Sequence, residues 1–208
     1  MNRGLANEPL KGLILVFDLD DTITPYIPNI PINTGIHVLN PDMITILRRA
    51  LIIKGSNPEN VSGIFLYTNN SDKNYIDFIH GLVSKELGVS NVFDDILWAS
   101  EGILNSRKKN IADIEDLCKR NNISTDNLPN RVYFFDDQIH SNLLETLSKG
   151  HYILIKSRVP SIKYDMQGYV PAFNSATNLT SVRSALRMTG GNRRTRTKKN
   201  KKRYSRKH

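Results

Sequence analysis

The segment Leu13–Thr22 constrains the fold of this chain more than any other stretch. Five apolar residues, Leu13–Phe17, lead directly into three aspartates, Asp18, Asp20 and Asp21. An apolar run of this length, without polar alternation, is typical of a strand that is buried on both faces. The aspartates then follow the carboxyl end of that strand, where open α/β sheets place their binding sites. We therefore expect an α/β fold with a functional site that begins at Asp18.

Three carboxylates within four positions repel one another, so a folded protein must compensate their charge. The simplest compensation is a divalent cation bound by oxygen ligands. The alternative is a buried strand that merely ends in a polar turn. A turn, however, does not require the Asp-x-Asp-x-Thr pattern of residues 18–22. The sequence therefore predicts that Mg²⁺ is bound at this strand end.

The basic character of the chain is confined to its C-terminus. The formal net charge is +9 over 208 residues, with 29 Lys and Arg against 20 Asp and Glu. Ten of the 29 lie between Arg193 and Lys207, where there is no acidic residue, so the rest of the chain is nearly neutral. We expect an N-terminal extension over residues 1–12, one domain over 13–188, and a basic, disordered tail over 189–208.

The single cysteine and the hydropathy pattern indicate where the protein resides. Cys118 excludes an intramolecular disulfide framework and fits a reducing intracellular compartment, cytoplasmic or nuclear. It lies at helical spacing from Ile114, so we expect a buried structural thiol. No apolar run approaches the ~20 residues of a membrane span. Residues 1–9 are too polar for a secretory signal.

Strand and helix patterns alternate five times along the chain. The expected strands cover residues 13–17, 63–67, 95–99, 131–135 and 151–155. The first expected helix begins at Asn40-Pro41 and ends before Gly55. The other expected helices cover residues 73–87, 110–120, 140–149 and 176–188. This alternation predicts a three-layer, Rossmann-like parallel sheet of five strands with helices on both faces.

Polar residues follow two further strands of this predicted sheet. Thr68 and Asn69 come at a strand-to-helix turn, where a hydroxyl and backbone N–H groups can hold an anion. Asp136 and Asp137 follow the fourth strand. All of these strand ends share one edge of a parallel sheet, so Mg²⁺ between the first and fourth strands would balance their carboxylates.

A lysine completes this set of groups. Lys108 and Lys109 precede the helix expected at residues 110–120, and either one supplies a positive partner at the same edge. Carboxylates, magnesium, one lysine and hydroxyl or amide donors together suit phosphoryl transfer.

Four segments, in this order, resemble the motifs of the haloacid dehalogenase-like (HAD) phosphohydrolase superfamily. Residues 18–22 resemble its first motif and residues 64–68 its second. Lys108 or Lys109 would be the third, and residues 132–137 resemble the Asp-Asp form of the fourth. The resemblance covers roughly residues 13–155 and implies a HAD-like fold.

The resemblance also implies roles for individual residues. Asp18 would be the nucleophile that forms an aspartyl-phosphate. Asp20 would be the general acid that protonates the leaving oxygen, and then the base that activates water. Thr68 would bind the phosphoryl group, although it could instead cap the following helix. Lys109, or Lys108, would steady Asp18 and the phosphate.

The metal ligands follow from the same resemblance. Mg²⁺ would be held by a carboxylate oxygen of Asp18, the backbone carbonyl of Asp20, and Asp137 or Asp136. Carboxylate–Mg²⁺ sites do not need imidazole, so His140 is not expected to be a ligand. Asp21 is expected to be structural, and one of the two lysines is expected to lie on the surface. Asn142 could anchor the loop after the fourth motif or lie on the surface of a helix.

Neither interval between the motifs is long enough for a full cap domain. There are 45 residues between Thr22 and Thr68 and 40 between Thr68 and Lys109. This minimal-cap arrangement is similar to that of superfamily members that act on macromolecules. We expect a Mg²⁺-dependent phosphatase acting on phosphate monoesters of a small molecule or a macromolecule. The alternatives are a phosphotransferase, or a catalytically idle protein that binds nucleic acid.

The basic tail over residues 193–208 leaves several partners open. It could contact nucleic-acid phosphates, direct nuclear import, bind an acidic partner, or serve solubility alone. Gly190-Gly191 followed by basic residues is similar to the endings of some proteins of large DNA viruses.

Overall fold

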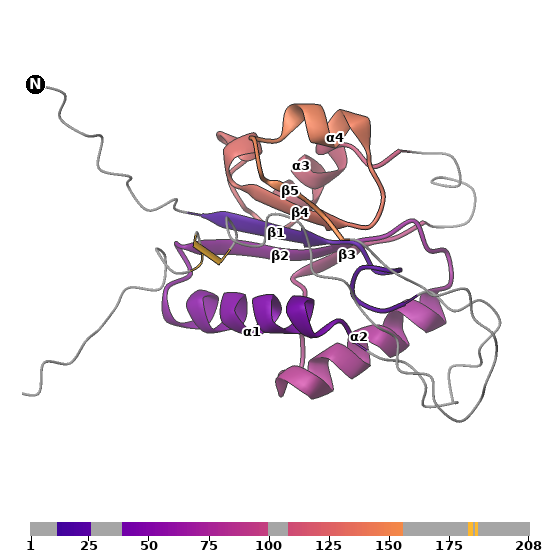
Figure 1. The fold of residues 1–208 in the computed structure, drawn as a ribbon. Coiled ribbons are helices and arrows are strands. Elements are labelled where there is room, and N and C mark those ends of the chain that lie inside the picture. The colour runs from indigo at the N-terminus through magenta and orange to yellow at the C-terminus, as the bar shows by residue number, and fades with distance from the viewer. Residues whose placement is uncertain (1–11, 26–38, 100–107, 156–182, 185, 187–208) are drawn as a thin grey trace, which may run out of the picture.

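The computed structural model describes residues 12–25, 39–99, 108–155, 183, 184 and 186. Within these ranges five parallel strands form one sheet in the order β3-β2-β1-β4-β5 (Figure 1). The strands are β1 Leu13–Phe17, β2 Val61–Tyr67, β3 Asp95–Leu97, β4 Val132–Asp136 and β5 Tyr152–Leu154. The helices are α1 Pro41–Ser56, α2 Lys73–Leu87, α3 Ile111–Arg120 and α4 Ser141–Thr146, with a 3-10 turn at Leu128–Asn130.

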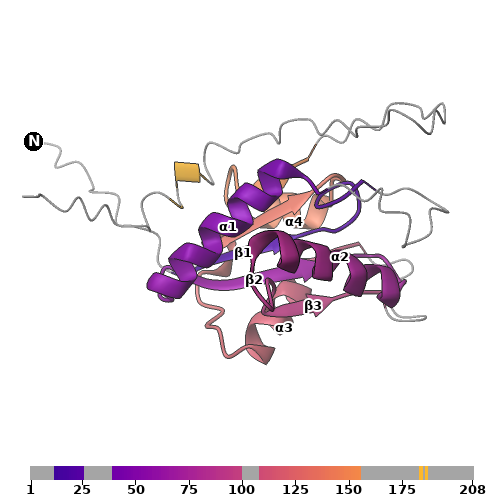
Figure 2. The same ribbon diagram turned by 90° about the horizontal axis from the view of Figure 1, so that it is seen from below.

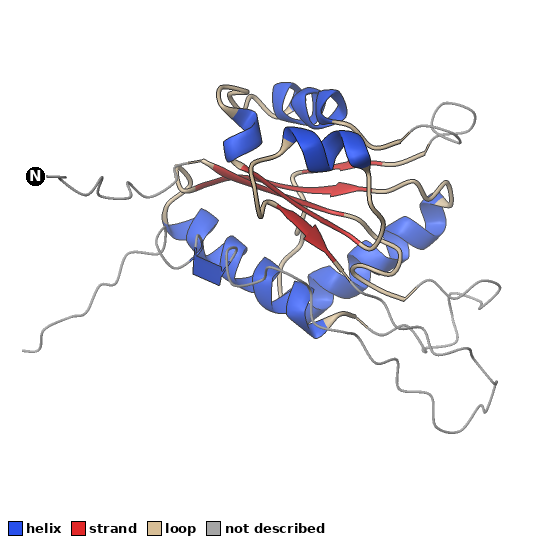
Figure 3. Ribbon diagram, turned by 45° about the horizontal axis from the view of Figure 1, so that its top comes forward, coloured by secondary structure: helices blue, strands red, loops and turns tan. Residues whose placement is uncertain are grey.

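Helices cover both faces of the sheet. Helices α1 and α2 lie against one face, and α3 and α4 lie against the other (Figures 2 and 3). The side chains of β1 alternate between the two: Leu15 and Phe17 pack with α1 and α2, whereas Ile14 and Val16 pack with α3 and α4. Every residue of β1 is therefore buried, as its unbroken apolar sequence predicts. The predicted three-layer α/β fold is confirmed.

Side-chain caps fix where the longer helices begin. Asn40 accepts a hydrogen bond from the N–H of Asp42 ahead of Pro41, and Asp72 and Asn110 cap α2 and α3 in the same manner. Helix α2 ends at Gly88, whose φ of 70° is left-handed and is best tolerated by glycine. These boundaries match those that the sequence predicts.

Other boundaries differ by a few residues because tertiary contacts set them. Helix α4 ends at Thr146, although helix was predicted as far as residue 149. Leu147 turns to an extended conformation and buries its side chain in the core, and the N–H of Ser148 donates to Pro129 O. Strands β3 and β5 are each shorter than predicted, and β4 includes Asp136.

The strand order places β1 in the centre of the sheet, between β2 and β4. The chain leaves β1 toward β2 on one side and returns to its other side as β4. A sheet of this kind has its topological switch point between β1 and β4, which is where ligands bind in open α/β folds.

Several predictions concern residues that lie outside the described ranges. The segments concerned are residues 1–11, the basic tail and most of the helix predicted over 176–188, of which residues 183, 184 and 186 are helical.

Cys118 is buried and not disulfide-bonded, as predicted. In the part of the chain that the structure describes, no helix has the length and hydropathy needed to cross a membrane.

Candidate active site

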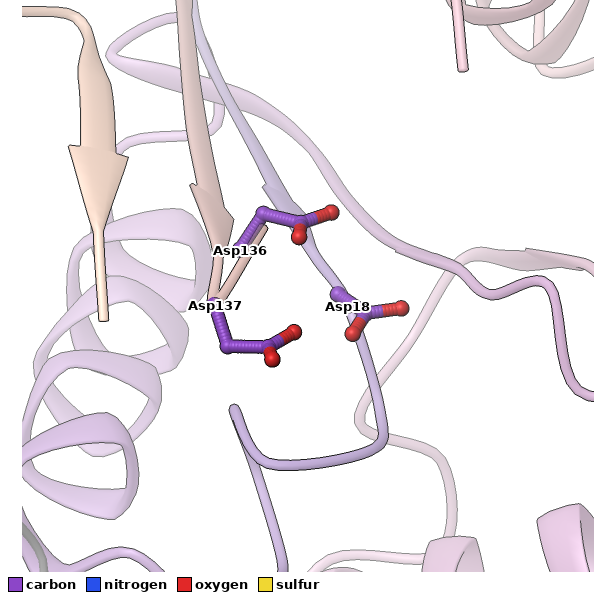
Figure 4. A group of neighbouring side chains, drawn as sticks. All are labelled: Asp18, Asp136 and Asp137. Carbon is purple, nitrogen blue, oxygen red and sulfur yellow. The ribbon is translucent and has the colours of Figure 1, made fainter. Parts of the chain in front are cut away.

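Three carboxylates meet at the switch point between β1 and β4. Asp18 directly follows β1, and its N–H donates to Phe135 O at 2.8 Å, which continues the pairing of the two strands. Asp136 ends β4 and Asp137 follows it. Figure 4 shows their side chains at the ends of the neighbouring strands, with the carboxylate of Asp137 directed toward Asp18. One oxygen from each of the three lies within 4.8 Å of the others.

Lys109 lies among these carboxylates. Its Nζ donates to Asp18 Oδ1 at 2.5 Å and to Asp136 Oδ2 at 2.7 Å, and its side chain is only 2% exposed. The ammonium also lies 5.5 Å and 5.6 Å from the ring centroids of Tyr67 and Phe134. A buried lysine needs such partners, because an unpaired buried charge is strongly destabilising.

The two adjacent lysines have opposite surroundings. Lys109 immediately precedes Asn110, the N-cap of α3, and points into the site. Lys108 is exposed and does not line the site cavity. The structure thus brings Lys109, and not Lys108, to the predicted position.

The loop after β2 forms the opposite wall. Thr68 is fully buried, and its Oγ1 accepts the N–H of Asn70 at 3.0 Å. It does not cap α2, because Asp72 accepts the bond from the N–H of Tyr75. Thr68 and Asn69 both line the cavity, as predicted.

A side chain of this loop, that of Asn70, binds Asp20. Nδ2 of Asn70 donates to Asp20 Oδ2 at 3.0 Å. Oδ1 of Asp20 is buried and has no hydrogen-bond partner among the described residues. Asp21, the next residue, has a left-handed φ of 55°, and its N–H donates to Thr24 O at 2.7 Å. Asp21 is therefore the turn residue that returns the chain after β1, since Asp tolerates this conformation better than most residues.

These residues enclose a cavity of about 380 Å³. The twelve described residues that line it are all polar or charged, and five of them are aspartates. Lys109 is the one lysine among the twelve, and no arginine lines the cavity within the described ranges. The lining therefore carries a strong excess of negative charge.

Burial and neighbouring charges change the pKa values of the carboxyl groups in the cavity. Burial raises the pKa of Asp18 to about 8; Lys109 opposes this rise, and Asp136 adds to it. Burial likewise raises the pKa of Asp20 and of Asp137 to about 6 each. Asp136 differs: although burial alone would raise its pKa, hydrogen bonds from His140 and Lys109 hold it below the ordinary value. Clustered perturbed groups of this kind are typical of functional sites.

The donor set fits a hard divalent cation. Asp18 and Asp137 offer carboxylate oxygens that converge, and burial raises the pKa of each. Oxygen-only ligands of this kind suit Mg²⁺ or Ca²⁺ rather than a softer metal.

Two neighbours that the sequence interpretation assigned no part in the site prove to be part of it. Asn70 binds Asp20, and His140 is buried with Nε2 at 3.3 Å from Asp136 Oδ2. His140 lies four residues after Asp136, but this spacing alone does not predict the turn that brings its side chain back to Asp136. Asn142, by contrast, is exposed on α4, in keeping with a surface position.

No family model and no curated protein matches the chain. Among solved structures, a proposed HAD-like phosphatase from Mesorhizobium loti matches with a TM-score of 0.53 and 18% identity. The match covers 89% of this chain and 91% of that chain. The fold is HAD-like.

Two more distant structures also match. An uncharacterized protein from Listeria monocytogenes serotype 4b has a TM-score of 0.42 and 13% identity, over 64% of this chain and 72% of that chain. A chain of the Pnkp1/Rnl/Hen1 complex has a TM-score of 0.35 and 15% identity, over 67% and 42% respectively.

Proposed function

We propose that this protein is a Mg²⁺-dependent phosphohydrolase that cleaves phosphate monoesters through an aspartyl-phosphate on Asp18. The observation that carries the proposal is the contact of Lys109 with both Asp18 and Asp136 at the switch point of a HAD-like sheet. A nucleophilic carboxylate beside a fixed ammonium suits attack on an anionic phosphorus centre, because the lysine offsets the repulsion.

Asp20 is suited to proton transfer. With a pKa of about 6 it exchanges a proton readily near neutral pH. In the first step Asp18 attacks phosphorus, and protonated Asp20 gives its proton to the leaving oxygen. In the second step ionised Asp20 takes a proton from the water that attacks the aspartyl-phosphate, which releases phosphate and restores Asp18. Asn70 holds Asp20 in place for both steps.

Mg²⁺ would be held by a carboxylate oxygen of Asp18, the backbone carbonyl of Asp20 and Asp137. We prefer Asp137 to Asp136, because Asp136 already binds Lys109, His140 and the N–H of Gln138. When bound, the cation would offset the charge of the acidic lining and of the phosphate. Thr68 and Asn69, which line the same cavity, would contact the phosphoryl oxygens.

A macromolecular phosphate ester is the substrate class that we favour. Among the described residues that line the cavity there is no aliphatic side chain and no Phe, Tyr or Trp to bind an apolar leaving group. Recognition would then come from surfaces beyond the cavity, and the basic tail over residues 193–208 is a candidate for contacts with nucleic-acid phosphates.

Hydrolysis of an aryl phosphate tests the proposal directly. We expect turnover that requires Mg²⁺ and is lost with a chelator, and we expect Asp18→Asn to lower kcat at least about 10³-fold, as for other lost nucleophiles. Burst-phase trapping of phosphate on the protein would detect the aspartyl-phosphate. Lys108→Met is the matched control, since this exposed neighbour should leave kcat unchanged, whereas Lys109→Met should not.

Full activity in Asp18→Asn would contradict the mechanism. Transfer of phosphate to an added acceptor instead of water would indicate a phosphotransferase. No turnover of nucleotides, sugar phosphates, phosphopeptides or end-phosphorylated oligonucleotides, together with salt-dependent nucleic-acid binding through the tail, would support the idle binding protein.

A further inference from the structure

His140 lies at the wall of the cavity but has no part in the chemistry above. Its side chain is 9% exposed, and Nε2 lies 3.3 Å from Asp136 Oδ2. The same oxygen accepts the 2.7 Å bond from Lys109, which continues to Asp18 at 2.5 Å. A continuous series of polar contacts therefore connects His140 to Asp18 through Asp136 and Lys109.

Tyr152 on β5 fixes the backbone on both sides of Ile139. Its hydroxyl accepts the N–H of His140 at 3.1 Å and donates to Gln138 O at 2.6 Å. Phe134 supports both rings, with centroid separations of 5.4 Å to Tyr152 and 6.5 Å to His140. Ile139 itself points outward and is 61% exposed. The turn is thus held by its polar contacts and not by burial of its apolar residue.

The carboxylate of Asp136 is held at both of its oxygens. Oδ1 accepts the N–H of Gln138 at 2.7 Å, and Oδ2 accepts from Lys109 and lies within reach of His140. Without the contact from His140, Oδ2 of Asp136 would be held by the Lys109 ammonium alone. Because Lys109 Nζ is hydrogen-bonded to the Asp136 carboxylate, the position of the ammonium relative to Asp18 depends on how firmly that carboxylate is held.

We propose that His140 and Tyr152 are positioning residues that fix the Asp136 carboxylate and, through it, the Lys109 ammonium against Asp18. The inference rests on the proposed function, because it concerns the same phosphoryl-transfer site. His140 acts as a hydrogen-bond donor from Nε2. The proposal requires only that Nε2 of His140 carries a proton.

Three substitutions separate positioning from simple packing. His140→Leu removes the donor, His140→Gln keeps a donor of similar reach, and Tyr152→Phe keeps the ring but loses the hydroxyl. We expect kcat to fall about 10- to 100-fold in His140→Leu, as for a lost bond to a charged group, with KM within about twofold of wild type. His140→Gln should recover most of kcat, and Tyr152→Phe should lower it about 3- to 10-fold.

Two kinetic outcomes would overturn the inference. One is an unchanged kcat in His140→Leu. The other is an equal loss in the Leu and Gln variants, which would mean that only the imidazole shape matters. Asp18→Asn, measured in parallel, separates the two proposals. If wild type is active, Asp18→Asn is inactive and His140→Leu equals wild type, then only the positioning role fails.

A second readout needs no substrate or metal. In the ring-nitrogen NMR spectrum of the ¹⁵N-labelled protein, the His140 signal is the one that disappears in His140→Gln. We expect this ring to carry a proton on Nε2. A neutral ring protonated only on Nδ1 would overturn the inference even in an active phosphatase. If no phosphate ester is hydrolysed, the spectrum still tests the contact between His140 and Asp136.

Discussion

Asp136 and Asp137 are consecutive residues with different electrostatic environments. The side chain of Asp136 is 1% exposed, and its contacts with Lys109 and His140 keep its pKa below the ordinary value. Asp137 is half-buried, and burial together with the charge of Asp136 raises its pKa to about 6. Lys109 gives Asp136 a positive partner, and under the proposed function Asp137 would bind the added cation.

Substitution of Asn70 should change the pH dependence of catalysis. The Asn70 amide stabilises the charged form of Asp20 and so lowers its pKa against the effect of burial. Asn70→Ala removes this bond, so the pKa of Asp20 rises. We expect the limb of the kcat/KM profile that reports Asp20 to move upward by about one pH unit.

The control for this experiment is Asn74→Ala. Asn74 is exposed on α2, just beyond the site loop, and its substitution should leave the profile in place. A profile in Asn70→Ala that stays where it was, or moves to lower pH, would show that Asn70 does not stabilise ionised Asp20.

The sequence identified the charged residues of the site more readily than their supports. Asp18 and Asp137 could be predicted because strand ends in a parallel sheet share one edge. The choice between Lys108 and Lys109 could not, because it depends on the side-chain direction just ahead of the Asn110 cap. The contacts of Asn70 also escaped prediction, because a loop has no periodicity from which its side-chain directions follow.

At the scale of elements, Asn40 connects a helix to the site. Its Oδ1 caps α1 by accepting the N–H of Asp42, and its Nδ2 donates to Thr22 O at 3.0 Å. Because Thr22 closes the turn that carries Asp20 and Asp21, one buried asparagine couples the start of α1 to the loop after β1.

Asn40→Ala should therefore destabilise the protein more than loss of an ordinary cap. We expect about 2–3 kcal/mol in the free energy of unfolding: about 1 for the cap and the rest for the buried Thr22 carbonyl left unpaired. Urea unfolding measures this. Asp72→Ala, which removes the exposed cap of α2, is the matched comparison at about 1 kcal/mol. Equal losses would mean that the bond to Thr22 contributes nothing.

Local chemistry also explains which elements could be predicted. Helices α1 and α2 carry their start signals at Asn40-Pro41 and Asp72, and Gly88 ends α2. The end of α4 has no such signal: Leu147 leaves the helix to fill the core beneath it. Short edge strands such as β5 likewise depend on their neighbour, because pairing with β4 decides where they end.

At the scale of the whole molecule, the acidic site costs stability when no cation is bound. Folding raises the pKa of Asp18 to about 8 and that of Asp20 and Asp137 to about 6. The folded state then binds more protons than the unfolded state between pH ~4 and ~8. The stability that these groups contribute is fully present below pH ~4 and is lost as the pH rises through their folded pKa values.

Without Mg²⁺, the free energy of unfolding should therefore decrease as the pH rises from 7 to 8.5. The slope has an upper limit of about 1.4 kcal/mol per pH unit for each proton. Asp18→Asn should flatten it, and Mg²⁺ should stabilise wild type more at the higher pH. Urea unfolding at several pH values measures the slope.

Comparing the pH slopes of wild type and Asp18→Asn isolates the contribution of Asp18 to the pH dependence of stability. His80 and His151 have pKa values lowered by burial, and Cys118 has one raised to about 11, but these groups are the same in both proteins. Slopes that are equal in wild type and Asp18→Asn, or stability that increases with pH in wild type, would contradict the assignment.

The pairing of β1 with β4 has a consequence for biosynthesis. Ile14 pairs with Val132 and Phe17 with Phe135, so the strand that leads to Asp18 meets its partner only after most of the chain has been made. A ribosome-bound chain that lacks β4 carries Asp18 without Asp136, and one long edge of its central strand has no neighbour. Such an edge can pair with other chains. The pairing that builds the candidate site thus leaves the nascent chain without its complete acidic cluster and dependent on prompt closure of its sheet.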